Sequence, residues 1–525
     1  MTVQHLSRRT LLGASGLLLL PAGVQADSAS PIAKTIHGPV RGYVDQGIKV
    51  FKGVRYGADT APRRFRPPVA PTPWTKVLDA TAHGPSSPQG GRDDEAQSED
   101  CLFLNVWTPG LRDGGRRPVM VYLHGGAYSN GSGSSPLYDG VRLCMRGDVV
   151  VVTINHRLNV FGYGFLAKLA GSRFADSGNA GMLDILLALA WVRDNAAQFG
   201  GDPSRVMVFG QSGGGAKIAT MMAMPAAAGL FHSAATMSGQ QVTASGPLHA
   251  TERMTLFLAA VGLTPDRAAE AATLPVGKLL DGLAVRDPFT PGGLYFGPVL
   301  DERSLTRHPF WPDAAPQGLK IPMIIGNTHD EARAFVARSR PDPFAMGWGD
   351  VAGRIAPEMR VDIDPDHVVA AYRKLYPDYS PSEVFFAAIT AGRSWRGAVI
   401  EAEERARAGA PAFVYQLDLP STVEGGRLRA MHTTDIPLVF DNLAARGSPV
   451  APSPAAQGVA DAMSEAFIAL AKTGNPNNPA LPAWTPYDLI RRATMVFDAE
   501  TRVVDDPRGA ERRLFAKVPY IQPGT

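Results

Sequence analysis

A serine between glycines stands where a short apolar segment gives way to a helical pattern. Residues 210–214 read Gly-Gln-Ser-Gly-Gly and fit the pattern G-x-S-x-G, with a strand predicted at 206–209 and a helix at 215–222. In that context small residues allow a tight turn, which lifts the hydroxyl of Ser212 above the end of a sheet. The hydroxyl then faces a helix N-terminus, where free N–H groups favour developing negative charge. These residues predict a serine nucleophile.

Two other interpretations of this segment have less support. The spacing of Gly210 and Gly215 is typical of a phosphate-binding loop, but Ala216 stands where that loop needs lysine, and Lys217 comes one position late. The remaining alternative is a glycine-rich turn without a chemical role. The strand before the turn and the helix after it favour the nucleophile.

A second glycine-containing segment follows another predicted strand. Residues 124–128 read His-Gly-Gly-Ala-Tyr, and glycines let a backbone approach a substrate closely. We expect the N–H groups of Gly126, Ala127 and Gly213 to bind the oxyanion of a tetrahedral intermediate, each contributing about 3 kcal/mol. His124 precedes the serine, whereas the base of such a hydrolase follows it, so His124 is expected to orient the loop.

The base and the acid are sought after the serine, in the order serine, acid, histidine. A loop after a predicted buried strand offers Asp330 and Glu331, and composition does not choose between them. His432 follows this loop and the next predicted strand, whereas His367 begins a helix and is expected at the surface. The carboxylate would hold the imidazole in one tautomer while the imidazole removes the hydroxyl proton. Asp435 is a third candidate acid, expected instead to fix its loop.

The elements around these residues predict an α/β architecture. Nearly continuous apolar runs are typical of strands buried on both faces, and therefore of a parallel sheet covered by helices. A helix is predicted at 181–198, antiparallel β-segments near the N-terminus, and helix-rich insertions at 241–320 and 340–410. The strands are predicted at residues 118–123, 149–154, 206–209, 322–325 and 412–417.

Taken together, several separate motifs resemble the type B carboxylesterases, the family of cholinesterases and bacterial para-nitrobenzyl esterases. The matching stretches are 51–56, 98–106, 124–127, 155–158, 209–217, 329–331, His432 with Ile436-Pro437, 474–476 and Trp484. The resemblance implies an α/β-hydrolase fold with a large, mostly parallel sheet flanked by helices, and helical insertions that form a gorge leading to Ser212. It makes Glu331 the triad acid and places Ser238 in a supporting position near the triad.

The N-terminal residues predict export. A twin arginine, Arg8 and Arg9, precedes a short apolar stretch that ends near Pro21, and small residues precede a cleavage site after Ala26. Residues 1–26 are therefore interpreted as a twin-arginine signal peptide, which implies a periplasmic or secreted bacterial protein. Residues 27–525 are expected to form a single domain.

Composition excludes several classes of protein. With 525 residues, 45% of them hydrophobic and 19% charged, the chain is neither disordered nor a fibrous repeat. A net charge of +3 predicts no nucleic-acid surface, and the longest apolar run is too short to span a membrane. No motif implies a metal or another cofactor. Spacing alone leaves one bridge between Cys101 and Cys144 open, but the helical context of Cys144 before a buried strand favours a buried free thiol.

These observations predict a serine hydrolase that acts on a small-to-medium carboxylic ester through an acyl-enzyme. A relative specialised for an amide, lactone, mycotoxin or polyester is the alternative within the enzymes. The alternative outside them is a non-catalytic adhesion protein, but such relatives lose the serine or the histidine, and this chain keeps Ser212 and His432. The sequence leaves a monomer and a homodimer equally open.

Overall fold

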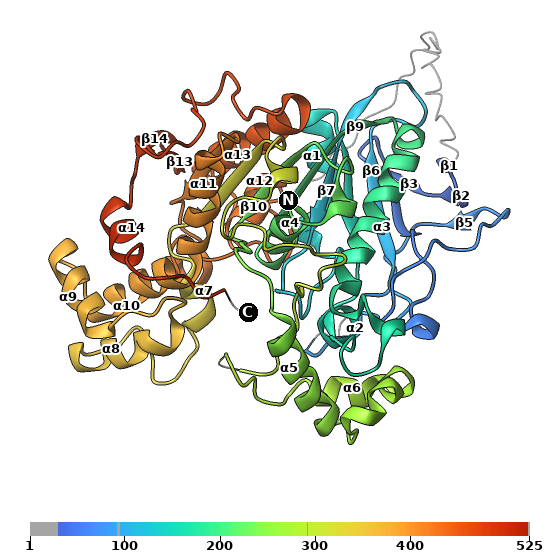
Figure 1. The fold of residues 1–525 in the computed structure, drawn as a ribbon. Coiled ribbons are helices and arrows are strands. Elements are labelled where there is room, and N and C mark those ends of the chain that lie inside the picture. The colour runs from blue at the N-terminus through green and yellow to red at the C-terminus, as the bar shows by residue number, and fades with distance from the viewer. Residues whose placement is uncertain (1–29, 92–94, 291, 523–525) are drawn as a thin grey trace, which may run out of the picture.

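One large sheet runs through the centre of the protein in the computed structural model, which describes residues 30–91, 95–290 and 292–522 (Figure 1). The sheet has eleven strands in the order β14-β13-β12-β11-β10-β9-β7-β8-β6-β4-β3. The strand pairs from β13 to β8 are parallel, and those that add β14, β6, β4 and β3 at the two edges are antiparallel. A mostly parallel sheet was predicted, and this is confirmed. The predicted export signal lies outside the described residues.

The strands of this sheet are β3 Tyr43–Asp45, β4 Ile48–Arg55, β6 Phe103–Thr108, β7 Arg117–Leu123, β8 Val150–Ile154, β9 Gly201–Gln211, β10 Ser233–Met237, β11 Met323–Thr328, β12 Ala412–Leu417, β13 Ala493–Phe497 and β14 Arg502–Asp505. All five segments predicted as central strands are strands. Strands β6, β10, β13 and β14 were not predicted from the sequence, and only residues 206–209 of β9 were.

Helices cover both faces of the sheet, and β7 shows how its residues divide between them. Val119 and Val121 pack with residues of α3, α4 and α11 on one face. Met120 and Tyr122 point the other way and pack with residues of α1, α12 and α13. Because alternate side chains of a strand point to opposite faces, a strand buried on both sides is apolar throughout. This explains the continuous apolar runs in the sequence.

The helices are α1 Val141–Gly147, α2 Asn159–Tyr163, α3 Ala180–Asn195, α4 Gly213–Met221, α5 Pro247–Ala260, α6 Val276–Gly282, α7 Ala332–Val336, α8 Trp348–Ile355, α9 Pro365–Leu375, α10 Pro381–Thr390, α11 Arg396–Arg407, α12 Asp435–Val439, α13 Pro454–Thr473 and α14 Gly509–Phe515. The helix predicted at 181–198 corresponds to α3 and the 3₁₀-helix Ala196–Phe199 that continues it.

Both predicted insertions are rich in helices. Helices α5 and α6 belong to the first insertion. In the second, α8, α9 and α10 pack with α14 around a hydrophobic cluster of their own, which includes Val351, Tyr372 and Phe515. Figure 1 shows this group, coloured yellow to red, beside the end of the sheet. A π-helix, Ala391–Trp395, joins α10 to α11 without a break, and it carries residues to the functional site described below.

The N-terminal segments differ in part from the prediction. An antiparallel edge was predicted from segments 35–43 and 49–54. Strand β4 lies at this edge, but its partner there is β3 at residues 43–45, and most of segment 35–43 belongs to another sheet. Strands β1 (Ile32–Thr35) and β2 (Gly38–Arg41) pair with each other, and β2 also pairs with the short β5 (Leu78–Asp79) in a separate three-stranded sheet. Alternation in these short segments predicts strands but does not specify their partners.

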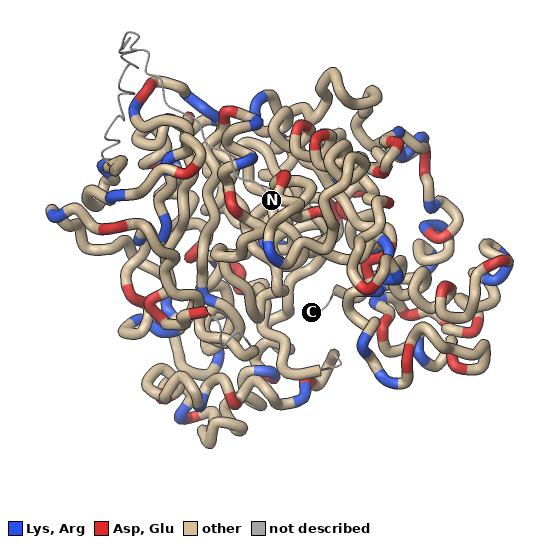
Figure 2. Tube along the Cα trace, turned by 180° about the vertical axis from the view of Figure 1, so that it is seen from behind, with Lys and Arg blue, Asp and Glu red and all other residues tan. Residues whose placement is uncertain are grey.

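Surface charge and hydropathy show no extreme feature in the described part of the chain. Lys and Arg are interspersed with Asp and Glu along the trace (Figure 2). No helix among the described residues is long and apolar enough to cross a bilayer.

Cys101 and Cys144 are both free thiols and both buried, as expected.

Candidate active site

Ser212 occupies the turn between β9 and α4 in a strained backbone conformation. Its φ of 57° and ψ of −125° form a combination that non-glycine residues rarely adopt and that costs of order 1–3 kcal/mol. Ser212 N donates to Met237 O at 2.7 Å, and Ala216 N donates to Ser212 O at 3.1 Å. A Cβ on Gly210 would lie only 2.7 Å from the carbonyl carbon of Gly214, so this tight turn needs glycine. The serine stands at the end of β9, where the motif predicts it.

A buried carboxylate and an imidazole meet at the same end of the sheet. Glu331 follows β11 and pairs through Oε2 with Nδ1 of His432. Its other oxygen accepts a hydrogen bond of 2.8 Å from Thr328 N. Burial by itself raises the pKa of the Glu331 carboxyl, but the charge and hydrogen bond of His432, together with Ser238 and the N–H of Thr328, outweigh burial and lower this pKa below its usual value. Glu331 is therefore ionised at neutral pH and favours the tautomer that carries a proton on Nδ1.

Ser238 lies beside this pair, as the resemblance implies. It follows β10, and its backbone N donates to Gly326 O of β11 at 2.7 Å. Its hydroxyl is close enough to the Glu331 carboxylate to lower the pKa of that group, although its oxygen lies outside the geometry of a formed hydrogen bond. Parallel β10 and β11 therefore bring Ser238 and Glu331 to the same edge of the sheet.

The other two candidate acids have different partners. Asp330 binds Arg333 at 3.1 Å and His329 at 3.1 Å. Asp435 is buried at the start of α12 and accepts a hydrogen bond of 2.8 Å from the Tyr415 hydroxyl. Burial and the negative charge of Glu331 raise the pKa of Asp435 to about 7. The structure therefore brings only Glu331, of the three candidates, against the His432 ring.

The His432 ring and Ser212 line the same pocket. Among the described residues, no hydrogen bond joins the Ser212 hydroxyl to the ring, and the Gln211 side chain contacts it instead. Gln211 Nε2 lies 3.1 Å from His432 Nε2 and 3.4 Å from Nδ1. Hydrogen bonds of this kind are often long in a free enzyme and tighten when substrate binds. The sequence analysis did not anticipate the contact from Gln211.

The loop at 124–128 has the backbone freedom that its glycines suggest. Gly126 has a φ of 84° and Ala127 a φ of 51°. The backbone N–H groups of Gly126, Ala127 and Gly213 donate to no protein group in the described residues, and Ala127 and Gly213 line the pocket. His124 Nδ1 lies 2.9 Å from Gly125 O, and the ring stacks on His156 with centroids 4.8 Å apart. The His124 ring therefore contacts the backbone of the loop, and its role in orienting the loop stays a prediction.

The pocket shared by Ser212 and His432 has a volume of about 290 Å³. Tyr128 and Gly239 contribute to it from the ends of the sheet, and the second insertion contributes Arg360 and Arg393. The two arginines were not identified from the sequence. No group of three or more His, Cys, Asp or Glu side chains within the described ranges could hold a metal ion.

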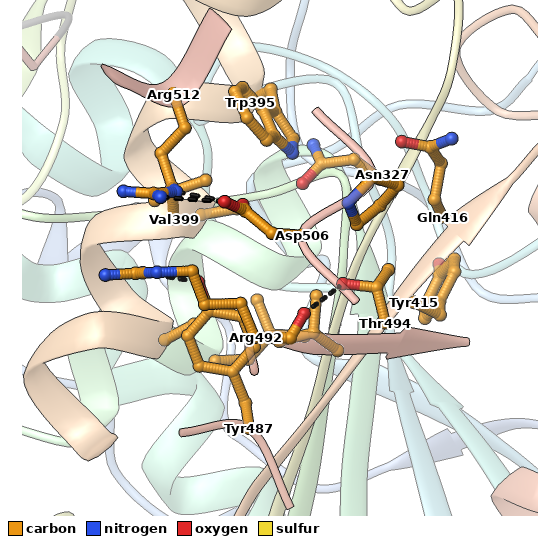
Figure 3. A pocket seen from close by; sticks show the side chains of 15 residues that line it. Asn327, Trp395, Val399, Tyr415, Gln416, Tyr487, Arg492, Thr494, Asp506 and Arg512 are labelled. Carbon is orange, nitrogen blue, oxygen red and sulfur yellow. Dashed lines mark hydrogen bonds and ion pairs between the residues drawn. The ribbon is translucent and has the colours of Figure 1, made fainter. Parts of the chain in front are cut away.

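A narrower cavity lies between α11 and the strands β11, β12 and β13 (Figure 3). Its volume is about 30 Å³, which is of the order of a single water molecule. Asn327 and Trp395 line it, and its charged groups are already paired, since Arg512 donates to Asp506 at 2.8 Å and 2.9 Å. The larger pocket is therefore the one in which a substrate can reach Ser212.

Comparisons with known proteins identify the family. The family model described as the carboxylesterase family matches residues 29–515. The chain belongs to the carboxylesterase family. It is 34% identical over 500 residues to the para-nitrobenzyl esterase of Bacillus subtilis, covering 92% of this chain and 98% of that one. It is 32% identical to the phenmedipham hydrolase of Pseudarthrobacter oxydans, covering 90% and 95%.

A solved structure supports the same conclusion. The Geobacillus stearothermophilus carboxylesterase EST55 superposes with a TM-score of 0.83 at 35% identity, covering 92% of this chain and 99% of the other. The fold is that of the α/β-hydrolases, and the protein is a carboxylic-ester hydrolase.

Lys217 of this carboxylesterase has a role that sequence reasoning missed. It is fully buried in α4, and Nζ donates to Ala127 O at 2.8 Å and to His124 O at 3.2 Å. The ammonium also lies 5.5 Å from the ring centroid of Tyr128. Burial lowers the pKa of Lys217 to about 7. The sequence feature that could have indicated this role is a lysine within an apolar helix that directly follows the serine turn.

Proposed function

We propose that this carboxylesterase hydrolyses esters through a covalent acyl-enzyme formed on Ser212, with His432 as the base and Glu331 as its partner. The observation that carries the proposal is the buried Glu331–His432 pair, whose histidine lines one pocket together with a serine held in a strained turn. Such a constellation is recognised by geometry and roles.

In the proposed mechanism, substrate binding displaces the Gln211 amide, and the Ser212 hydroxyl takes its place at His432 Nε2. The serine oxygen then forms a bond to the ester carbonyl carbon while Nε2 accepts its proton. The carbonyl oxygen becomes an oxyanion, bound by the N–H groups of Gly126, Ala127 and Gly213. When the tetrahedral intermediate collapses, the C–O bond to the alcohol breaks, and His432 returns the proton to that alcohol.

Deacylation repeats these steps with water. His432 accepts a proton from the water, whose oxygen attacks the acyl carbon, and then returns a proton to the Ser212 oxygen as the acid leaves. Throughout, Glu331 accepts a hydrogen bond from Nδ1, which keeps Nε2 available and stabilises the imidazolium. The proposed substrates are small-to-medium esters. A lactone, amide, mycotoxin or polyester is the alternative.

The decisive test is Ser212→Ala. We expect loss of 4-nitrophenyl butanoate hydrolysis by at least about 10³-fold, with an unchanged far-UV spectrum and unfolding midpoint. In the unaltered protein, a fluorophosphonate should label one residue, on the peptide that contains Ser212. Ser172→Ala, at an exposed position that begins the 3₁₀-helix Ser172–Phe174 and is not among the residues lining the pocket, is the matched control and should keep both activity and labelling. Full activity of Ser212→Ala would refute the mechanism.

A further inference from the structure

Two guanidinium groups line the pocket that contains Ser212. Arg360 precedes α9 and Arg393 lies in the π-helix Ala391–Trp395, so both come from the second insertion. Neither takes part in the proposed mechanism. Positive charge at a pocket wall costs desolvation energy unless it has a partner, so the partners of the two groups indicate what the pocket accepts.

Arg393 already has its counterion within the protein. Its Nη1 donates to Glu358 Oε2 at 2.5 Å, and its guanidinium lies 4.7 Å from the ring centroid of Phe335. The wide turn of a π-helix inserts an extra residue between α10 and α11, a distortion that is frequent at functional sites. It brings both Arg393 and the neighbouring Ser394 to the pocket.

Arg360 is fixed in position, and no carboxylate within the described ranges forms an ion pair with it. Its backbone N donates to Gly392 O at 3.0 Å, and its backbone O accepts from Ile521 N at 2.7 Å. Nε of its guanidinium is buried without a hydrogen-bond partner in the described residues. Burial and the positive charge of Arg393 lower the pKa of Arg360, and the opposing effect of the negative charge of Glu358 is too small to offset them.

The two guanidinium groups therefore share one carboxylate, Glu358, which is hydrogen-bonded to Arg393, and one positive charge is left in excess at the pocket. The planar fork of a guanidinium matches the two oxygens of a carboxylate. Ser394 and Tyr295 also line this pocket and add hydroxyl groups to it. Building on the proposed function, we propose that Arg360 is a specificity residue that binds a carboxylate on the substrate, so that the preferred substrates are esters carrying one free carboxylate.

The test uses two pairs of esters that differ only in a carboxylate and its neutral carboxamide. The first pair is 4-butanoyloxybenzoate and 4-butanoyloxybenzamide, with the charge on the alcohol side. The second is mono-4-nitrophenyl adipate and 4-nitrophenyl 5-carbamoylpentanoate, with the charge on the acyl side. The ratio of kcat/KM within each pair is compared between variants, so that differences in intrinsic reactivity cancel.

In Arg360→Gln we expect this anionic-to-neutral ratio to fall by about tenfold or more in one of the two pairs, while kcat/KM for the neutral esters changes by less than about threefold. Arg360→Lys keeps the charge without the planar fork and should recover part of the ratio. Arg502→Gln, which removes the same charge from the exposed edge strand β14, is the matched control and should leave the ratio unchanged.

The outcomes separate this inference from the proposed function. An unchanged ratio in both pairs, or an equal loss for charged and neutral esters, would overturn the role of Arg360 in an otherwise active esterase. If the unaltered protein hydrolyses none of the four esters and Ser212 takes up no fluorophosphonate, the proposed function fails and this inference fails with it.

Discussion

The two adjacent acids after β11, Asp330 and Glu331, have different surroundings. Glu331 turns inward to His432, whereas Asp330 turns to Arg333 and His329. Composition did not choose between Asp330 and Glu331 as the triad acid, and the family resemblance favoured Glu331. Both residues carry a carboxylate, so residue type does not distinguish them. Neighbouring side chains in a turn point in different directions, and only the folded turn decides which carboxylate faces His432.

We predict that Glu331→Gln lowers kcat by about 10³-fold or more, because an amide cannot hold the imidazole in the required tautomer or stabilise its cation. Asp330→Asn is the matched control. It weakens a largely buried ion pair with Arg333, which costs up to about 3–5 kcal/mol of unfolding free energy. It leaves the contact between Glu331 and His432 in place, so kcat measured below the unfolding transition should stay within about threefold of the unaltered protein. Rates with 4-nitrophenyl butanoate measure both. A larger loss in Asp330→Asn would reassign the acid.

At the scale of elements, α4 both supports the serine turn and holds the loop at 124–128. Lys217 makes this connection through the carbonyls of His124 and Ala127. We predict that Lys217→Met leaves these buried carbonyls without a donor, which costs about 1–3 kcal/mol of unfolding free energy. It should also lower kcat by about tenfold or more, because the loop loses its fixed position. Thermal unfolding and ester turnover would measure the two effects.

The same lysine predicts a pH dependence of stability. Its pKa is lowered from 10.5 in the unfolded chain to about 7 in the folded protein, so between these values the unfolded chain binds the proton more readily. The unfolding free energy of the unaltered protein relative to Lys217→Met should therefore rise with pH from about 7 to about 10.5. Denaturant titrations across that range measure this difference. A difference that stays constant or falls with pH would contradict it.

Elements with strong local signals could be predicted, and elements defined by their neighbours could not. Strand β8, Val150–Ile154, is apolar and β-branched, and it was identified. Strand β10, Ser233–Met237, reads Ser-Ala-Ala-Thr-Met, and only its place between β9 and β11 makes it a strand. Arg360 and Arg393 were missed for the same reason, because the packing of the second insertion decides which of its side chains reach the pocket.

At the scale of the whole molecule, the sheet separates the two cysteines. Cys101 belongs to the hydrophobic cluster on one face and Cys144 to the cluster on the other, so no disulfide can join them without unfolding. Burial raises the pKa of both thiols, which keeps them unreactive. We predict that reducing agent leaves the unfolding midpoint unchanged, within about 1 °C. A lower midpoint under reducing conditions would show that disulfide chemistry contributes to stability.

A fold that needs no disulfide is also suited to complete folding before export. We propose that residues 1–26 direct the folded chain through the twin-arginine route, which leaves a mature protein that starts after Ala26. Replacing Arg8 and Arg9 with lysine should keep esterase activity in the cytoplasmic fraction of a bacterial host, while the unaltered chain delivers it to the periplasm or medium. Activity should survive the replacement, because both arginines lie before residues 29–515, the part of the chain that the carboxylesterase family model matches. Efficient export of the lysine variant would contradict the twin-arginine assignment, since a general secretory signal tolerates that change.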